Sequence, residues 1–320
     1  MSKENKIMSR GNKIAVTNSR LSDEQLAKIK AAAPNFEISN TVDADCEIIF
    51  GHVSKDDLAR AKGLKWLHLQ SAGVEHVLRP EMGLGESVIL TNSAGMHGIA
   101  IAEHMLGFTL MLMRKMHDYG KLQAAHKWEY QGSGKSIWQS VVTVVGLGGI
   151  GSQYAARCRA LGATVRGVVR TARAETPDCV DELFTNEQLD AAITGADVVA
   201  LSLPSTAETS HIINKERMLK MKKGAIIINI GRGSAIDQDA LVEMLESGQI
   251  GGAGLDVTTP EPLPADSKLW DAPNVIITPH ASHGGLDMTL DFIVDRFVGY
   301  LKDYAAGLAF DKVVDRKLGY

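Results

Sequence analysis

Cysteine is scarce in this sequence, with three residues among 320: Cys46, Cys158 and Cys179. They show neither the paired spacing of a zinc site nor the even number of a disulfide framework. We therefore expect reduced thiols with mainly structural roles, no bound metal, and a cytoplasmic location.

Dense basic clusters and long apolar runs are also missing. Asp and Glu (38) outnumber Lys and Arg (34), giving a formal charge of −4, which argues against nucleic acid as a partner. The longest apolar stretch, Met105–Met113, is too short to span a bilayer, and the polar N-terminus lacks the apolar segment of a secretory signal. A globular protein that binds neither nucleic acid nor a membrane is the expectation.

The most informative stretch is Val141–Gly151, VVTVVGLGGIG, which reads as a buried strand followed by a G-x-G-x-x-G turn into a helix. Gly146 permits the tight turn, Gly148 lets the backbone approach a pyrophosphate, and Gly151 lets the helix pack on the strand. The helix start offers unpaired N–H groups and a positive dipole end to phosphates. This context predicts dinucleotide binding, with an ordinary glycine-rich turn as the alternative.

The first part of the chain alternates between predicted strands and helices, which implies a parallel sheet with helices on both faces. We expect strands at residues 13–17, 36–38, 47–50, 66–69 and 88–90, and helices at 22–33 and 56–61. The small residues Ser71, Ala72, Gly73 and Val74 follow one of these strands. Their amides are candidates to hold a carboxylate, and a plain strand-to-helix turn fits the local sequence equally well.

A long apolar helix is expected from His97 to about Met116, with Glu103 and His104 as hydrogen-bonded structural groups. Polar residues 117–140 look like a connecting excursion. The later part of the chain has further apolar runs typical of strands buried on both faces, at 164–169, 198–203, 225–230, 252–256 and 275–278, with helices at 188–193, 215–221 and 237–247. A last helix, 286–308, returns the chain to the first domain. The predicted domains are 1–104 plus 286–320 for substrate, and 105–285 for dinucleotide.

An acidic residue is missing where NAD-binding proteins normally carry one, at the end of the second strand of this domain. The sequence there reads Val169-Arg170-Thr171-Ala172-Arg173. A guanidinium can pair with a 2′-phosphate, which an acid would repel. Arg170, Thr171 and Arg173 therefore favour NADP(H), while NAD(H) stays possible.

Three later stretches each place a charged or titratable residue just beyond a predicted strand, where open α/β sheets bind ligands. They are Asn229-Ile230-Gly231-Arg232-Gly233-Ser234, then Gly254-Leu255-Asp256-Val257 with Pro260-Glu261-Pro262-Leu263, and Asn274 to Ser282 with His280. Together they supply an anion clamp, a carboxylate and an imidazole.

These motifs, in this order, resemble the D-isomer-specific 2-hydroxyacid dehydrogenase family over nearly the whole length, from SAGVEH through GLGGIG, NIGRGS, GLDV, PEPLP and TPHAS. The resemblance implies an α/β fold of two Rossmann-like or flavodoxin-like doubly wound parallel-sheet domains with a cleft between them. It also implies a homodimer formed through the Rossmann domain, and reduction of a 2-oxoacid to the D-2-hydroxyacid.

Residue roles follow from the same resemblance. Arg232 would bind the oxoacid, His280 would be the general acid, and Glu261 would be the partner of His280. These roles fit the reaction, because hydride transfer leaves negative charge on the substrate oxygen. Substrate binding is assigned to Ser71, Ala72, Gly73, Val74, Arg232 and His280. Cofactor binding is assigned to Gly146, Gly148, Gly149, Ile150, Gly151, Arg170, Thr171, Arg173, Pro204, Thr209, Ile230, Asp256 and Ser282.

Other functions stay open on the sequence. The same fold can serve as a dinucleotide-sensing regulator with weak chemistry. Relatives that oxidise formate, phosphite or 3-phosphoglycerate would share these motifs. The sequence does not choose among glyoxylate, pyruvate, branched 2-oxoacids and 2-ketopantoate as the substrate.

Overall fold

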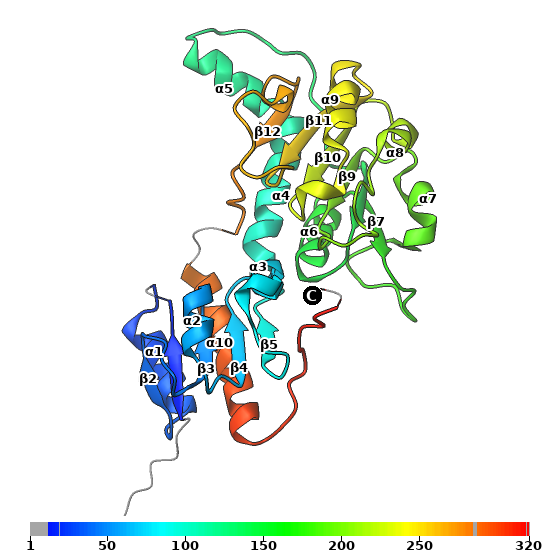
Figure 1. Ribbon diagram of the computed structural model, residues 1–320. Coiled ribbons are helices and arrows are strands. Elements are labelled where there is room, and N and C mark those ends of the chain that lie inside the picture. Colours follow the sequence, from blue (N-terminus) through cyan, green and yellow to red (C-terminus); the bar gives the residue numbers. More distant parts are fainter. Residues whose placement is uncertain (1–11, 19, 284–286, 318, 320) are drawn as a thin grey trace, which may run out of the picture. The chain divides into compact units, whose positions relative to one another are not determined.

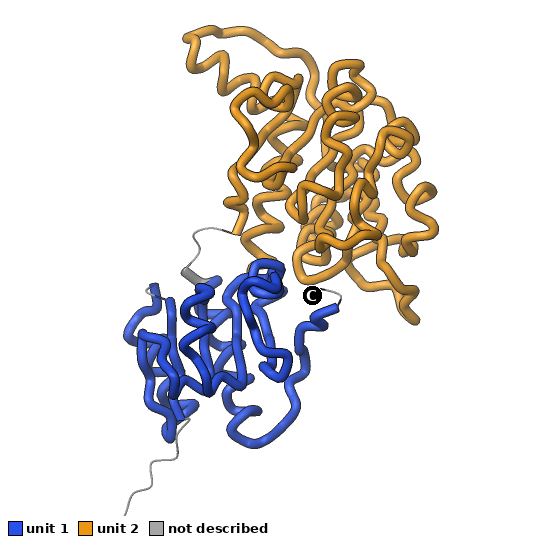
Figure 2. The backbone as a smooth tube through the Cα atoms, viewed as in Figure 1, with its two compact units in different colours: residues 1–96, 285–320 blue, residues 97–284 orange. Residues whose placement is uncertain are grey.

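The computed structural model describes residues 12–18, 20–283, 287–317 and 319, and the chain divides into two compact units (Figures 1 and 2). Unit 1 comprises residues 1–96 and 285–320, and unit 2 comprises residues 97–284. The long helix α4 (Gly98–Met113), which the sequence analysis divided at 104/105, lies wholly in unit 2. In the described part of the chain, no helix is long and apolar enough to cross a membrane.

Unit 1 is built on a five-stranded parallel sheet in the order β2-β1-β3-β4-β5. This order is the flavodoxin-like one that the family resemblance implied. The strands and helices are β1 (Lys13–Val16), α1 (Asp23–Ala32), β2 (Glu37–Ser39), β3 (Cys46–Phe50), α2 (Lys55–Arg60), β4 (Trp66–Leu69), α3 (Glu75–Leu78), the 3-10 turn η1 (Pro80–Met82), β5 (Ile89–Asn92) and α10 (Asp287–Ala305). Leu286, the expected start of the last helix, lies outside the described residues.

Helix α10 and helix α1 cover one face of this sheet. The ring of Phe297 on α10 stacks on Phe50 of β3, with ring centroids 4.2 Å apart, and Trp66 of β4 lies beside it at 5.1 Å. Alternate strand residues such as Ile49 and Leu67 belong to a separate buried cluster on the other face. The last helix therefore does return to the first domain's sheet, because its apolar side completes this core.

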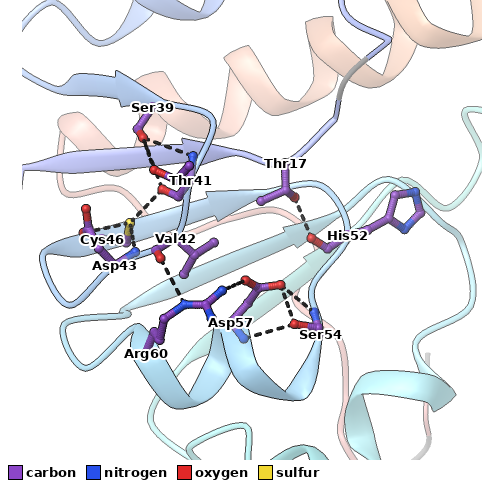
Figure 3. A network of polar contacts seen from close by, with 10 residues as sticks. All are labelled: Thr17, Ser39, Thr41, Val42, Asp43, Cys46, His52, Ser54, Asp57 and Arg60. Atoms are coloured by element: carbon purple, nitrogen blue, oxygen red, sulfur yellow. Dashed lines mark hydrogen bonds and ion pairs between the residues drawn. The ribbon is translucent and has the colours of Figure 1, made fainter.

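Local capping fixes the start of helix α2 in unit 1 (Figure 3). At the start of α2 the Ser54 hydroxyl accepts a hydrogen bond from the Asp57 amide at 3.1 Å, and the Asp57 carboxylate accepts one from the Ser54 amide at 2.9 Å. This reciprocal capping satisfies two helix-end donors. Cys46 is buried nearby with its thiol 3.4 Å from the Asp43 carboxylate, and all three cysteines are free, as the sequence analysis expected.

Unit 2 has a seven-stranded parallel sheet in the order β12-β11-β10-β9-β6-β7-β8, which contains the doubly wound Rossmann order. The strands are β6 (Val141–Val145), β7 (Thr164–Val169), β8 (Glu182–Thr185), β9 (Val198–Leu201), β10 (Ala225–Asn229), β11 (Ile250–Leu255) and β12 (Val275–Ile277). The other elements are α5 (Met116–Ala124), α6 (Gly149–Ala160), η2 (Asn186–Gln188), α7 (Leu189–Ile193), α8 (Lys215–Lys220), η3 (Gly233–Ala235), α9 (Gln238–Glu246) and η4 (Lys268–Trp270).

Two buried apolar clusters lie on the two faces of the sheet in unit 2. One contains side chains of α4 and α6, and the other contains side chains of α7, α8 and α9. The edge strand β8 and the helix α5 of this unit were not predicted. The helix expected from His97 to about Met116 ends earlier, at Met113, and Lys115 has a left-handed φ of 57°; α5 then occupies part of the stretch 117–140 that was expected to be a connecting excursion.

Candidate active site

The glycine-rich turn joins β6 to α6 at the point where the strand order of unit 2 reverses. Gly146 has φ +98°, and its amide donates to the Val168 carbonyl at 2.9 Å. A Cβ at Gly151 would lie 1.9 Å from the Gly146 carbonyl oxygen, so only glycine fits there. A Cβ at Gly148 would meet no described atom within 4 Å, so this side of the turn is open. The three glycines therefore behave as a pyrophosphate-binding turn requires.

The start of helix α6 is available to a ligand. Gly148 is the N-cap residue and provides no side chain to cap the helix. Gly149 is exposed, Ile150 is half-buried, and the first turn contains no acidic residue. Unpaired amides and the positive dipole end at such a terminus favour a bound phosphate.

The residues after β7 lie beside this turn. Val168 pairs with Val145 in the sheet, so Arg170 follows the strand next to the glycine turn. Arg170, Thr171 and Arg173 are all exposed, and the Arg173 guanidinium donates to the Leu147 carbonyl of the turn at 3.1 Å. Cationic side chains with no intervening acid are suited to a 2′-phosphate.

Two further candidate cofactor residues belong to the loop after β9. The hydroxyl of the buried Thr209 donates to the Pro204 carbonyl at 2.7 Å. The same hydroxyl accepts a hydrogen bond from the Thr206 amide at 2.9 Å. Ile230, which follows β10, is also buried, with 6% of its surface exposed. These contacts fix the backbone at the carboxyl ends of β9 and β10.

A hydrogen-bonded turn positions Arg232 after β10. The buried Asn229 amide donates to the Arg232 carbonyl at 2.9 Å and its oxygen accepts from the Gly231 amide at 3.0 Å. The Arg232 side chain is half-buried and donates to the Gly231 carbonyl at 2.8 Å. A Cβ at Gly233 would lie 2.0 Å from the Thr258 carbonyl oxygen, so the turn is packed closely against the loop after β11.

The imidazole of His280 and the carboxylate of Glu261 form a pair. Their Nδ1 and Oε2 atoms are 2.9 Å apart, and both side chains are partly exposed. The other carboxylate oxygen of Glu261 accepts from the Thr258 amide at 3.0 Å, which fixes the acid. Because Nδ1 faces Glu261, the Nε2 atom of His280 is the ring nitrogen left to face a ligand.

His280 has an uncommon backbone conformation, with φ +52°. Its amide donates to the carbonyl oxygens of Asp256 at 2.9 Å and of Thr278 at 3.0 Å. A left-handed conformation at a residue other than glycine costs free energy and persists where the surroundings determine it. The loop thus holds the imidazole in a set direction.

The carboxylate of Asp256 supplies much of that constraint. It accepts hydrogen bonds from the Thr278 hydroxyl at 2.5 Å, the Ala281 amide at 2.8 Å and the Ser282 amide at 3.1 Å. Burial alone would raise the pKa of Asp256, but these hydrogen bonds outweigh burial and hold its pKa below the usual range. Asp256 and Ser282, both predicted to contact the cofactor, are hydrogen-bonded to each other in the structure and organise the His280 loop.

The sheet register brings the predicted reacting groups to one edge. Asn229 of β10 pairs with Leu255 of β11, which pairs with Ile277 of β12. Arg232 and His280 each follow three residues after one of these paired positions. The parallel strands therefore present the guanidinium, the Glu261 carboxylate and the imidazole on the same carboxyl edge of unit 2.

The predicted loop Ser71–Val74 belongs to unit 1 and follows β4. Ser71 donates through its hydroxyl to the Gly73 carbonyl at 2.8 Å, and Val74 is fully buried before α3.

The polar residues of α4 have structural partners, as expected: His104 Nε2 lies 3.0 Å from the Thr278 hydroxyl, and Glu103 pairs with Arg157.

Sequence reasoning missed the positioning residues Asn229 and Thr278. Both lie inside the quoted motifs, but a polar residue at a strand end has no distinctive local pattern. The signal that could have found Asn229 is its place directly before a glycine, a common arrangement in turns where an Asx side chain bonds the backbone.

Comparisons with known proteins identify the family to which the chain belongs. The family model for the NAD-binding domain of D-isomer-specific 2-hydroxyacid dehydrogenases matches residues 106–282. A solved D-isomer-specific 2-hydroxyacid dehydrogenase family protein from Aeromonas salmonicida is 30% identical, with a TM-score of 0.83 over 96% of this chain and 99% of that one. The solved NADPH-dependent glyoxylate/hydroxypyruvate reductase from Sinorhizobium meliloti, in complex with NADP and sulfate, is 26% identical, with a TM-score of 0.80 over 97% of this chain and 100% of that one.

A curated relative, D-3-phosphoglycerate dehydrogenase from Synechocystis, is 35% identical over 249 residues, which is 77% of this chain. The match spans only 44% of that relative's own length. The family model covers more than half of the chain and includes the glycine turn, Arg232, Glu261 and His280. This chain belongs to the D-isomer-specific 2-hydroxyacid dehydrogenase family, whose members are NAD(P)-dependent oxidoreductases.

Proposed function

We propose that this chain reduces a 2-oxoacid to the D-2-hydroxyacid with NADPH. The observation that carries the proposal is the His280–Glu261 pair, 2.9 Å apart, on the same sheet edge as Arg232 and the glycine turn. A bound nicotinamide dinucleotide would supply the hydride. The open Gly148, the uncapped start of α6 and the exposed guanidinium of Arg170 fit such a cofactor.

Three side chains of this chain would bind the substrate and transfer the proton. Arg232 holds the substrate carboxylate and faces the carbonyl oxygen with a fixed positive charge. His280 donates a proton from Nε2 to the oxygen that gains negative charge during reduction. Glu261 accepts the Nδ1 proton of His280 in a hydrogen bond, which orients the ring and stabilises its protonated form. The amides of Ser71–Val74 remain a prediction for binding the substrate carboxylate.

A steady-state assay of NADPH oxidation tests the reaction. The panel contains glyoxylate, hydroxypyruvate, pyruvate, a branched 2-oxoacid, 2-ketopantoate and 3-phosphohydroxypyruvate. His280→Ala and Arg232→Ala should each lower turnover by about two or more orders of magnitude without loss of folding. Near-normal turnover in either variant would remove the role given to that residue. Tight NADPH binding without turnover of any acid would instead favour a dinucleotide sensor.

The cofactor preference depends on the cationic end of β7. Arg170→Asp places a carboxylate where the 2′-phosphate would lie, so affinity for NADPH should fall about 10- to 100-fold while affinity for NADH changes little or improves. Binding is measured by the fluorescence of the reduced nicotinamide. A similar loss for both cofactors would contradict the assignment. Arg159→Asp, on the same unit and paired to Asp181, is the matched charge control.

A homodimer is also part of the proposal. Large apolar side chains stand exposed along α5 and the segment after it: Met116 at 56%, Trp128 at 103%, Tyr130 at 78% and Trp138 at 62%. Clustered exposed apolar side chains commonly mark protein interfaces. Light scattering coupled to size exclusion should give twice the chain mass of 34.5 kDa, and a single-chain mass would refute it.

A further inference from the structure

A chain of buried hydrogen bonds joins β4 to β5 and the residue after it on one face of the unit 1 sheet, and the Ser71–Val74 loop directly follows β4. The Trp66 indole donates to the Thr91 hydroxyl at 2.8 Å, and the same hydroxyl lies 2.7 Å from His68 Nδ1. His68 Nε2 lies 3.2 Å from the Ser93 hydroxyl, which donates to the Leu69 carbonyl at 3.0 Å. His68, Thr91 and Ser93 are fully buried, with 0% of their surface exposed.

The two ends of this chain decide the direction of every hydrogen bond in it. An indole N–H can only donate and a carbonyl can only accept. Thr91 already accepts from Trp66, so its own proton goes to Nδ1 of His68. The Nε2 atom of His68 then carries the ring proton and donates to Ser93, whose proton goes to Leu69. The neutral Nε2–H form of His68 satisfies all of these groups.

The charged form of His68 does not fit this arrangement. A proton on Nδ1 would face the Thr91 hydroxyl, which would receive two donors while its own proton lost its acceptor. Leaving a buried polar group unsatisfied destabilises the charged form. Burial, and to a smaller extent the positive charge of Arg296, lowers the pKa of His68 to about 3. This low pKa is consistent with the neutral form that the hydrogen bonds require.

The end of β5 continues this network into the loop. The Ser93 amide donates to the Ser71 carbonyl at 3.2 Å, and the Asn92 side-chain amide donates to the Ala72 carbonyl at 2.6 Å. Ser71 itself donates through its hydroxyl to the Gly73 carbonyl. Three successive carbonyl groups of the loop, at Ser71, Ala72 and Gly73, are thus each held by a donor.

Fixing these carbonyls also fixes the neighbouring amides. In a trans peptide the C=O of one residue and the N–H of the next point in opposite directions. The amides of Ala72, Gly73 and Val74 therefore point away from the donors that hold the preceding carbonyls. Among the residues described, none of these three amides donates a hydrogen bond. Val74 is fully buried, so the half-buried Ala72 and Gly73 provide the oriented donors that an anion could reach.

We propose that His68, Ser93 and Asn92 are positioning residues that aim the amides of Ala72 and Gly73 at the substrate carboxylate. This inference rests on the proposed function for its ligand. Because the network is anchored in the sheet, the sheet fixes the direction in which these amides point. Removing one member would leave the fold of unit 1 in place and tilt the donors.

The test compares KM for the preferred 2-oxoacid with kcat in four variants. His68→Leu breaks the buried chain, and Asn92→Ala removes the donor that holds the Ala72 carbonyl. Each should raise KM about tenfold, with kcat within about threefold and KM for NADPH unchanged. His68→Gln can offer an acceptor to Thr91 and a donor to Ser93, so it should restore most of the loss. Tyr304→Phe removes a hydrogen bond to Glu47 in the same unit and is the control for a general loss of stability.

A second measurement separates this inference from the proposed function. Oxalate is titrated into the ¹⁵N-labelled protein with bound NADP⁺, and the amide signals of Ala72 and Gly73 are followed. If oxalate shifts these signals in the wild type but not in Asn92→Ala, the inference stands even where no 2-oxoacid is reduced. Active variants with unchanged KM and wild-type oxalate shifts would overturn it. A wild type with neither turnover nor an oxalate response would overturn both proposals.

Discussion

Replacement of Asp256 by Asn tests whether a buried carboxylate directs the proposed proton donor. Asp256 follows β11, is 1% exposed, and accepts hydrogen bonds from the Thr278 hydroxyl and from the amides of Ala281 and Ser282. Asparagine has nearly the same size, but it turns one acceptor oxygen into a donor and removes the charge. At least one buried donor in the His280 loop would then lose its acceptor.

The expected cost follows from those contacts. Hydrogen bonds to a charged group contribute about 1.5–3 kcal/mol, and an orphaned buried donor costs about 1–3 kcal/mol, so Asp256→Asn should destabilise unit 2 by about 2–4 kcal/mol. The His280 amide is also bonded to the Asp256 carbonyl, so the imidazole should move with the loop. A displacement of about 1 Å at a reacting group can cost roughly 100-fold in turnover.

The assay pairs thermal unfolding with kcat/KM for the preferred 2-oxoacid. Asp197→Asn is the matched control, because Asp197 also accepts a backbone hydrogen bond, from Val141 at 3.0 Å, and pairs with Lys222. It lies at the amino-terminal edge of the same sheet, away from His280, and should lose stability while keeping kcat/KM. If Asp256→Asn behaved like this control, the carboxylate would be a structural group only. Unchanged stability and activity would refute the reasoning entirely.

Three further outcomes are expected. The pKa of Asp256 is lower in the folded state than its ordinary unfolded value of 3.8. Its stabilising contribution is therefore present above pH 3.8 and should disappear as the pH falls below that value. Acid unfolding of the wild type, compared with Asp256→Asn, measures this difference. The pKa of His68 is about 3 in the folded state and 6.5 in the unfolded state, so below pH 6.5 the unfolded state binds the extra proton. The free energy of unfolding should therefore fall by about 1.4 kcal/mol per pH unit below 6.5. Urea unfolding at pH 4 to 7 should show this slope in the wild type and not in His68→Leu. Gly151→Ala puts a Cβ 1.9 Å from the Gly146 carbonyl and should abolish NADPH binding and lower Tm, whereas Gly120→Ala, with open space around it, should change neither.

Much of the fold was determined by local sequence. The inner strands of unit 2, such as β6, β9 and β10, are continuous apolar runs because both faces of a parallel sheet are covered by helices. The glycine turn was equally predictable, since each glycine meets a steric demand that other residues cannot satisfy. Strand β8 was missed because Glu182–Thr185 is an edge strand with no fully buried residue. Helix α5 was missed for the same reason, because it has no buried residue to produce an apolar pattern.

The sequence by itself named the candidate reacting groups, Arg232, Glu261 and His280, because their residue types and their motifs at strand ends indicate that chemistry. Only the tertiary structure decided what holds them. Asp256 binds amides 25 and 26 residues away, and His68 binds hydroxyls on the neighbouring strand. Sheet register and peptide planarity set those contacts, and neither leaves a periodic signal along the chain.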